Sequence, residues 1–235
     1  MTTFVLVHGA WHGGWCWSRV RRLLSARGHD VHTPTLTGLG DRSHLLSRAV
    51  NLETHVQDVA NLLQWDELSD IVLCGHSYGG MVITGVANRM ASRIRALVYL
   101  DAFVPENGQS VLDFMPAERV AQFYDSVRDK GAGWLIPPRA AALFDVNEAD
   151  QAWVDRLCMP HPLACFEQKL MLPDAFARVG KRTYIQAANY TRSAFGPIAD
   201  RLRRDRSWRV TSLPCGHDVM VDMPGELAEL LIEAA

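Results

Sequence analysis

The chain alternates short apolar runs with longer segments of helical periodicity, and this alternation limits the folds open to it more than any other feature. The apolar runs carry β-branched and aromatic side chains at consecutive positions. Such strands are buried on both faces, as in a parallel sheet whose strands are joined by helical crossovers. The predicted strands are residues 4–9, 30–35, 71–74, 96–102, 182–187 and 208–213, and the predicted helices lie near residues 17–27, 52–65, 78–91 and 225–234. We therefore predict an α/β fold, with a mostly parallel sheet and helices on both of its faces.

The alternation stops between residues 105 and 179. This stretch has helical patterns near residues 117–130 and 148–158, several prolines, and no clear strand. It contains neither a repeat nor a low-complexity linker, so it should pack on the core and not fold as an independent domain. We predict a core formed by residues 1–104 and 180–235, and a small helical lid, residues 105–179, inserted after the fourth strand.

Charge and cysteine content narrow the choice of partners and compartment. The 235 residues include 24 basic and 26 acidic side chains, so the net charge of −2 offers no excess positive charge to phosphate backbones or anionic lipids. The apolar runs are far shorter than the roughly 20 residues of a membrane span, and no basic region precedes the first strand as in a signal peptide. The five cysteines are an odd number without CxxC spacing, which is typical of a reduced thiol set. We predict a cytoplasmic protein that binds neither nucleic acid nor membranes, and the sequence leaves open whether it forms a homodimer.

The third predicted strand leads into Gly-His-Ser-Tyr-Gly-Gly, residues 75–80, and then into a helix. A strand followed by Gly-x-Ser-x-Gly and a helix is typical of a nucleophile elbow. The turn is so tight that only glycine fits beside the serine, and the hydroxyl is exposed at the C-terminal edge of the sheet. We predict that Ser77 is a nucleophile and not merely a capping serine in an ordinary turn.

A serine hydroxyl becomes strongly nucleophilic when a base takes its proton, and a histidine oriented by a carboxylate is the usual base. His217 is the best placed of the nine histidines, because Leu-Pro-Cys-Gly-His-Asp, residues 213–218, directly follows the last predicted strand. The loop returns there over the edge of the sheet. We predict that His217 is the base.

The carboxylate is less obvious from the sequence. The loop after the next-to-last strand, residues 187–193, is the commonest position for it and contains no acidic residue. Asp200 follows, on what reads as the polar face of a helix. Asp101 ends the strand after the nucleophile helix, at the C-terminal edge of the sheet, where a buried carboxylate needs a partner. We predict Asp101 as the third member of the triad, with capping of the next turn as its alternative role.

An acyl-transfer site also needs N–H donors for the oxyanion. The backbone amide of Tyr78, directly after Ser77, is one candidate. We expect the second donor in the glycine-rich loop after the first strand, residues 8–15, and choose the amide of Ala10. The alternative is a glycine-rich turn without a catalytic role.

Aromatic side chains are candidates for the substrate pocket. Trp11 lies in the same glycine-rich loop, and four aromatic residues of the predicted lid either line an apolar pocket or form the core of the lid itself: Trp134, Phe144, Trp153 and Phe166. No His, Cys and Asp set has the spacing of metal ligands along the sequence. We therefore predict neither a metal nor another cofactor.

These motifs together resemble the α/β-hydrolase superfamily. FVLVHGAWHGGWCW, residues 4–17, with GHSYGG and CGHD, resembles its branch of small plant methylesterases, hydroxynitrile lyases and bacterial esterases. The match covers about residues 3–105 and 180–235. The resemblance implies Ser77 as nucleophile, His217 as base and an oxyanion hole formed by two backbone amides, those of Ala10 and Tyr78.

Three positions distinguish the esterases of this branch from its lyases. The lyases carry threonine, cysteine and lysine where this chain has Gly9, Tyr78 and Asp218. The lysine would stabilise a departing cyanide and Asp218 would repel it, so the resemblance favours hydrolysis. The missing acid in the loop after residues 182–187 departs from the common pattern and resembles dehalogenase-type members, which place the acid one strand earlier.

The resemblance implies an α/β-hydrolase fold and a serine esterase that needs no cofactor. Its substrates would be small, largely apolar carboxylic esters, cleaved through an acyl-enzyme. Two alternatives use the same fold. One is a lyase or C–C bond hydrolase with the same triad, and the other is a small-molecule receptor with low turnover.

Overall fold

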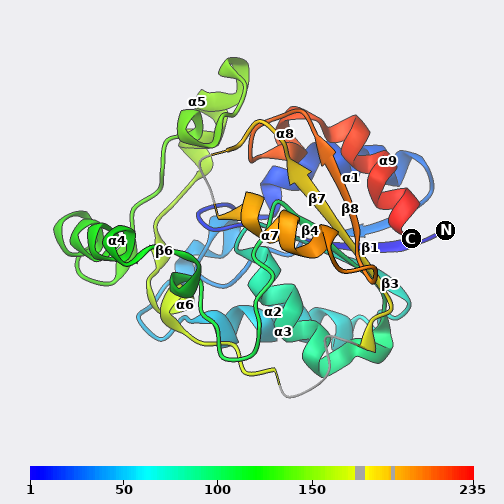
Figure 1. Ribbon diagram of the computed structural model, residues 1–235, viewed down its shortest axis with the longest axis horizontal. Helices are drawn as coiled ribbons and strands as arrows, with labels where there is room; N and C mark the ends of the chain where they lie inside the picture. Colours follow the sequence, from blue (N-terminus) through cyan, green and yellow to red (C-terminus); the bar gives the residue numbers. More distant parts are fainter. Residues whose placement is uncertain (173–177, 192–193) are drawn as a thin grey trace.

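The computed structural model describes residues 1–172, 178–191 and 194–235. Its main sheet has six strands in the order β2-β1-β3-β4-β7-β8, and every neighbouring pair is parallel (Figure 1). The strands are β1 (Thr3–Val7), β2 (Asp30–His32), β3 (Ile71–His76), β4 (Ile94–Leu100), β7 (Lys181–Ala187) and β8 (Arg209–Leu213). The predicted α/β fold is confirmed.

Helices cover both faces of this sheet, as Figure 1 shows. Helices α1 and α9 pack against each other on one face, and α2 and α3 pack against each other on the opposite face. The core helices are α1 (Ser18–Ala26), α2 (Leu52–Trp65), α3 (Gly79–Met90), α7 (Phe195–Arg203), α8 (Val219–Asp222) and α9 (Pro224–Ala234), and short 3₁₀ turns lie at Gly14–Trp17, Gly40–Leu45 and Ala91–Arg93.

Helix α2 shows how the sequence determines where these helices begin and which side of each is buried. The side chain of Asn51 accepts a hydrogen bond from the Thr54 amide at 3.0 Å and so caps the N-terminus. Its buried side chains Leu52, Val56, Val59 and Leu63 recur at helical spacing and form one apolar stripe. Except for the buried His55, the polar residues between them are half-buried or exposed, so the helix packs mainly on one side.

The parallel register brings the ends of distant strands to one edge of the sheet. All six residues of β3 are buried between β1 and β4, as expected for an apolar run covered on both faces. Leu6 of β1 lies beside Cys74 of β3, which lies beside Val98 of β4. The segments that follow β1, β3, β4 and β8 therefore emerge together at the C-terminal edge.

The stretch predicted as a lid contains helices α4 (Ala117–Lys130), α5 (Glu148–Leu157) and α6 (Ala164–Glu167), and 3₁₀ turns at Leu112–Phe114 and Ala141–Phe144. In Figure 1, α4 and α5 stand to one side of the main sheet. The expectation that this stretch has no strand is wrong. β5 (Leu135–Ile136) pairs antiparallel with β6 (His161–Pro162), and strands of two residues are too short to show a periodicity. Residues 173–177 of the predicted lid lie outside the described part of the chain.

No helix within the described residues is long and apolar enough to cross a membrane.

Candidate active site

Ser77 lies in a sharp turn between β3 and α3. Its backbone has a φ of +53°, in the left-handed region that non-glycine residues rarely adopt. A Cβ atom on Gly75 would lie 2.5 Å from the carbonyl oxygen of Gly79, so the turn requires glycine there. The Ser77 amide donates to the carbonyl of Leu100 at 3.1 Å, which fixes the turn against the end of β4. The conformation is that of a nucleophile elbow.

His217 and Asp101 meet beside this turn. His217 Nδ1 lies 2.6 Å from Asp101 Oδ2, and Asp101 Oδ1 accepts a hydrogen bond from the Ala187 amide at 3.2 Å. Both side chains are buried. Burial raises the pKa of Asp101, although the hydrogen bond from His217 opposes that shift. The two residues come from the ends of β8 and β4, which the register brings to the same edge.

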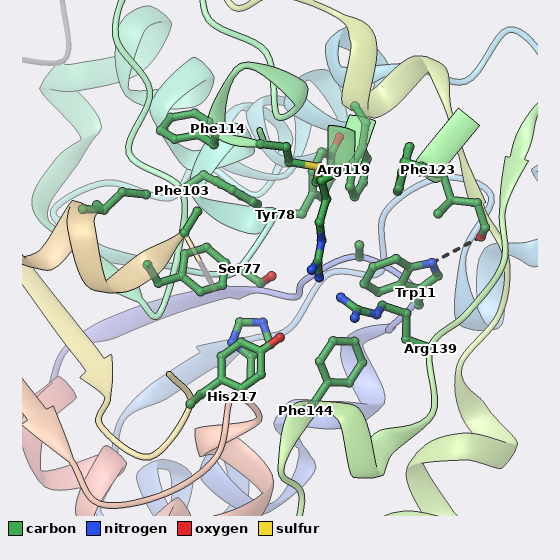
Figure 2. Close-up of a pocket in the computed structure, with 18 of the residues that line it drawn as sticks. Trp11, Ser77, Tyr78, Phe103, Phe114, Arg119, Phe123, Arg139, Phe144 and His217 are labelled. Carbon is green, nitrogen blue, oxygen red and sulfur yellow. Dashed lines mark hydrogen bonds between the residues drawn. The ribbon is translucent and has the colours of Figure 1, made fainter. Parts of the chain in front are cut away.

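Aromatic rings fix the plane of the His217 imidazole. Phe195 stacks on it with ring centroids 5.1 Å apart and an interplanar angle of 9°, and Tyr190 stacks at 4.8 Å and 29°. In Figure 2 the side chains of His217 and Ser77 face the same pocket. Within the described residues no hydrogen bond joins Ser77 Oγ to the imidazole. Such bonds are often long without substrate and shorten in the Michaelis complex.

The two predicted oxyanion donors line this pocket as well. Ala10 follows β1, and Tyr78 is the residue after Ser77. In the part of the chain that the structure describes, neither backbone amide donates a hydrogen bond to another residue. Both N–H groups are therefore available to an oxygen atom bound at Ser77.

The other two candidate acids have different partners. Asp200 is exposed on α7 and lies 2.7 Å from Arg203 Nη1. Asp218 is fully buried, but its Oδ2 lies 3.0 Å from His12 Nε2. Neither has a hydrogen bond to His217 among the described contacts. The structure brings Asp101 to His217 and gives Asp200 and Asp218 other hydrogen-bond partners.

His12 and Asp218 form a buried ion pair. His12 Nδ1 lies 2.8 Å from the carbonyl oxygen of Ala10, and its Nε2 faces Asp218. Because both partners are acceptors, both ring nitrogens must carry protons and the ring is an imidazolium. Burial alone would lower the pKa of His12, but the charge of Asp218 raises it well above its usual value. Burial alone would likewise raise the pKa of Asp218, and the charge of His12 holds it below its usual range.

This pair changes one expectation from the sequence. Asp218 does not line the pocket, and its charge is matched by His12. The idea that Asp218 repels a departing anion is therefore wrong in this structure. The contact from His12 to the Ala10 carbonyl instead fixes the peptide next to the Ala10 amide. Sequence reasoning missed the pair because its members lie 206 positions apart.

Replacing Asp218 with asparagine should lower the free energy of unfolding by about 3–5 kcal/mol, because His12 would lose its buried counter-charge. Asp218 stabilises the fold above the carboxyl pKa of the unfolded chain, about 4, and this contribution is lost as pH falls through its lowered folded pKa. His12 stabilises the fold below the unfolded imidazole pKa, about 6.5, and this contribution is lost as pH rises through its raised folded pKa. In urea unfolding, the variant should differ most from the wild type between about pH 4 and 6.5.

The matched control is Asp200→Asn, which removes an exposed carboxylate and should change the free energy of unfolding by no more than about 0.5 kcal/mol. An Asp218→Asn variant as stable as this control within that pH range would contradict the ion pair.

The pocket above Ser77 has a volume of about 960 Å³. Its wall is largely aromatic and is contributed by both the core and the predicted lid. The aromatic lining residues are Trp11, Tyr78, Phe103, Phe114, Phe123, Phe144, Phe166, Tyr190 and Phe195. A cavity of this size and lining suits a small, largely apolar molecule.

Of the five aromatic candidates for the pocket, Trp11, Phe144 and Phe166 line this cavity, and Trp134 and Trp153 do not. Trp11 and Phe144 form part of the wall (Figure 2). Trp134 lies elsewhere, with the Arg48 guanidinium 5.2 Å from its ring. Trp153 packs edge-on against Trp15, with ring centroids 5.1 Å apart. An aromatic residue in the lid can serve the lid's own packing equally well, and the sequence does not distinguish the two roles.

Sequence reasoning also missed three arginines that line the pocket, Arg119, Arg139 and Arg201. An arginine in the first turn of a polar helix, such as Arg119, reads as part of a solvated face. Only the position of α4 relative to the elbow reveals where its side chain lies.

Three buried side chains that could bind a metal ion, His55, His161 and Cys165, have ligand atoms within 4.8 Å of one another. Spacing along the sequence did not predict this cluster. His55 Nε2 donates to the Thr37 carbonyl at 2.9 Å, and its Nδ1 accepts from the Tyr78 hydroxyl at 3.0 Å. His55 is thus used in its neutral form, and burial lowers its pKa to about 4. These bonds give the cluster a role in fixing the side chain of Tyr78, and we assign no metal to it.

Comparisons with known proteins agree with this geometry. The Alpha/beta hydrolase family matches residues 4–230, and the chain belongs to that family. It is 48% identical, over 98% of both chains, to a carbendazim hydrolyzing esterase from Nocardioides sp.. It is 29% identical to a pyrethroid hydrolase from Sphingobium wenxiniae, over 100% of this chain and 88% of the relative.

A solved structure has the same fold. An extracellular alpha/beta-hydrolase from a Paenibacillus species superposes with a TM-score of 0.86 at 27% identity, covering 100% of this chain and 99% of the other. Methylesterase 1 of Arabidopsis thaliana is 35% identical over 46% of this chain and 41% of its own length. The resemblance inferred from the motifs is confirmed, and the chain is a carboxylic ester hydrolase.

Proposed function

We propose that Ser77, His217 and Asp101 form the catalytic triad of this esterase. The observation that carries the proposal is the 2.6 Å contact between His217 Nδ1 and Asp101 Oδ2, at the strand edge where the elbow presents Ser77. Asp101 accepts the Nδ1 proton, so the lone pair of Nε2 is free to act as a base. Two strand ends and one elbow, distant in sequence, thus supply three groups with complementary roles.

The reaction follows from these roles. Ser77 Oγ attacks the ester carbonyl as its proton passes to His217 Nε2, and the amides of Ala10 and Tyr78 bind the resulting oxyanion. Each such donor typically contributes about 3–4 kcal/mol to lowering the barrier. His217 then protonates the leaving alkoxide, which departs as an alcohol. Water, activated by His217, hydrolyses the acyl-enzyme and frees Ser77.

Gly9 supports ester hydrolysis over the lyase alternative. A Cβ atom at this position would lie 2.8 Å from His76 Nδ1 and 2.9 Å from Ser77 Cβ. The threonine that the lyases of this branch carry there would not fit unless the elbow moved. The second alternative is a receptor with little turnover. It does not require two backbone N–H groups, those of Ala10 and Tyr78, to be free to bind an oxyanion.

The pocket and the relatives together suggest the substrate class. The wall is apolar and rich in aromatic side chains, and relatives similar over the whole chain are named for carbendazim and pyrethroid hydrolysis. We propose that the substrates are small esters with an apolar, largely aromatic body.

We further propose that residues 105–179 act as a lid over this pocket. Trp11 Nε1 donates to the carbonyl of Ile136 at 3.2 Å, and the amide of Met159 donates to the carbonyl of Trp11 at 3.0 Å. These bonds tie the lid to the loop that carries Ala10. A cytoplasmic location is proposed as well, and it is supported by the five cysteines, which are all free.

A fluorophosphonate should modify Ser77 alone and abolish hydrolysis of p-nitrophenyl acetate, because Ser77 is the described serine that faces the pocket together with the proposed base His217. Peptide mapping by mass spectrometry identifies the labelled residue. Ser126 is a matched control, since it lines the same pocket on α4. Ser126→Ala should label and turn over like the wild type, and Ser77→Ala should not label. A label on Ser126 with activity lost would contradict the proposal.

A further inference from the structure

The pocket is basic although the chain is slightly acidic. The charged side chains among its described lining residues are Arg119, Arg139 and Arg201, and no aspartate or glutamate lies among them. The chain as a whole has a net charge of −2. A cavity whose wall is otherwise mostly apolar therefore carries positive charge.

One of these arginines is already neutralised. Arg201 forms an ion pair with Glu106 and donates to the carbonyl of Val104 at 2.7 Å. Arg119 and Arg139 have no ion pair and no hydrogen bond within the described residues. Arg139 lies 5.9 Å from the ring centroid of Phe144, so its contact is with an aromatic face. Among the described residues, two cationic groups of the pocket thus lack a counter-ion.

Both side chains point into the pocket. Figure 2 shows Arg119 extending from α4, and Arg139 extending from the segment after β5, into the space bordered by Ser77, Trp11 and Phe144. Both guanidinium charges also act to lower the pKa of Tyr190, although burial raises it overall. The Tyr190 ring stacks on His217, so the two positive charges lie near the catalytic end of the pocket.

Guanidinium groups in this setting select a particular ligand. Arg119 is exposed and Arg139 is half-buried, so a ligand that enters the pocket removes water from both, and an anionic group on the ligand offsets that cost. The planar fork of arginine matches the two oxygens of a carboxylate, and charge-assisted hydrogen bonds of this kind are about twice as strong as neutral ones. The apolar surroundings strengthen the attraction further.

We propose that Arg119 and Arg139 bind a carboxylate carried by the substrate, distinct from the ester group attacked by Ser77. The preferred substrates are then half-esters of small dicarboxylic acids, with an apolar or aromatic body between the two groups. The inference rests on the proposed role of Ser77 as nucleophile. The ester end is held at Ser77 and the free carboxylate at the two arginines, so the pair determines specificity and not the chemical step.

The test compares two substrates of equal shape. Mono-p-nitrophenyl adipate has a free carboxylate, and p-nitrophenyl adipamate has a neutral amide in its place. The wild type should prefer the adipate in kcat/KM by at least about tenfold. Arg119→Gln and Arg139→Gln should each lower kcat/KM for the adipate by about tenfold, mainly through KM, and should leave the adipamate within about twofold. Added salt should weaken the preference of the wild type.

Arg128→Gln is the matched control. Arg128 lies on the same helix as Arg119 and is exposed like it, but it does not line the pocket and is paired with Asp125 and Asp129. The substitution removes the same charge and should leave the adipate preference unchanged, and Arg119→Lys should restore part of that preference. An equal rate for the two substrates in the wild type would overturn the inference, and so would an unchanged preference in both arginine variants. If the adipamate is not hydrolysed at all, or if Ser77→Ala still hydrolyses it, the proposed function itself fails.

Discussion

Replacing Ser77 with alanine should lower kcat for p-nitrophenyl acetate on the order of 10⁵ to 10⁶-fold, the loss typical when a triad serine is removed. The remaining triad members cannot form an acyl-enzyme without the hydroxyl. The residual rate would come from the oxyanion donors and from water activated by His217. Initial rates at saturating substrate, with enough enzyme to detect this residual activity, measure the effect.

The same substitution should leave the fold intact. Ser77 Oγ has no hydrogen bond to another described residue, and alanine tolerates the left-handed backbone about as well as serine does. Urea unfolding should therefore place Ser77→Ala within about 1 kcal/mol of the wild type. A stable variant that keeps more than a hundredth of the wild-type kcat would show that Ser77 is not the nucleophile.

Replacing Asp101 with asparagine should lower kcat by about 10³ to 10⁴-fold. The reason lies in the two partners of the carboxylate. The Ala187 amide donates to Oδ1, and a backbone amide can only donate. The new asparagine side chain would keep its oxygen toward that amide, so its NH₂ group would face His217 Nδ1 and donate to it. The imidazole would then carry its proton on Nε2, where Ser77 requires a lone pair.

Asp200→Asn tests the specificity of this effect. Asp200 follows the next-to-last strand, as Asp101 follows an earlier strand. The carboxylate of Asp200, however, pairs with Arg203 on the surface. The substitution should keep kcat within about twofold of the wild type, because surface substitutions away from a site change little. If Asp200→Asn is the crippling change and Asp101→Asn is near the wild type, the acid has been assigned incorrectly, although the serine and the histidine would stand.

The sequence predicts well those features that depend on one element and its neighbour. Buried apolar strands imply a parallel sheet, and a parallel sheet brings the residues at its strand ends together. This reasoning placed Ser77, Asp101 and His217 at one edge, and the contact between the last two follows from it. Asp101 could be predicted as the partner of His217 because it follows an apolar strand, and a carboxylate buried there requires a hydrogen-bonding partner.

Features that depend on packing between distant segments could not be predicted. The His12–Asp218 pair joins the loop after β1 to the segment after β8. The residues around His12 do not indicate that its partner is Asp218, and those around Asp218 do not indicate His12. Trp153 and Phe144 look alike in sequence, yet only Phe144 reaches the pocket. Side-chain type and spacing do not fix the direction in which a lid residue points. That direction is set by how the lid rests on the core.

The order of the elements along the chain has a consequence for synthesis on the ribosome. The loop with Ala10, the elbow with Ser77, and β4 with Asp101 directly after it all emerge before β8 and His217. Until β8 pairs with β7, a nascent chain has the proposed nucleophile without the proposed base, and His12 is without its carboxylate partner Asp218. Domains tend to fold as units during translation. Nascent chains of this enzyme should therefore remain without activity toward esters in the cell until the segment after β8 has left the exit tunnel.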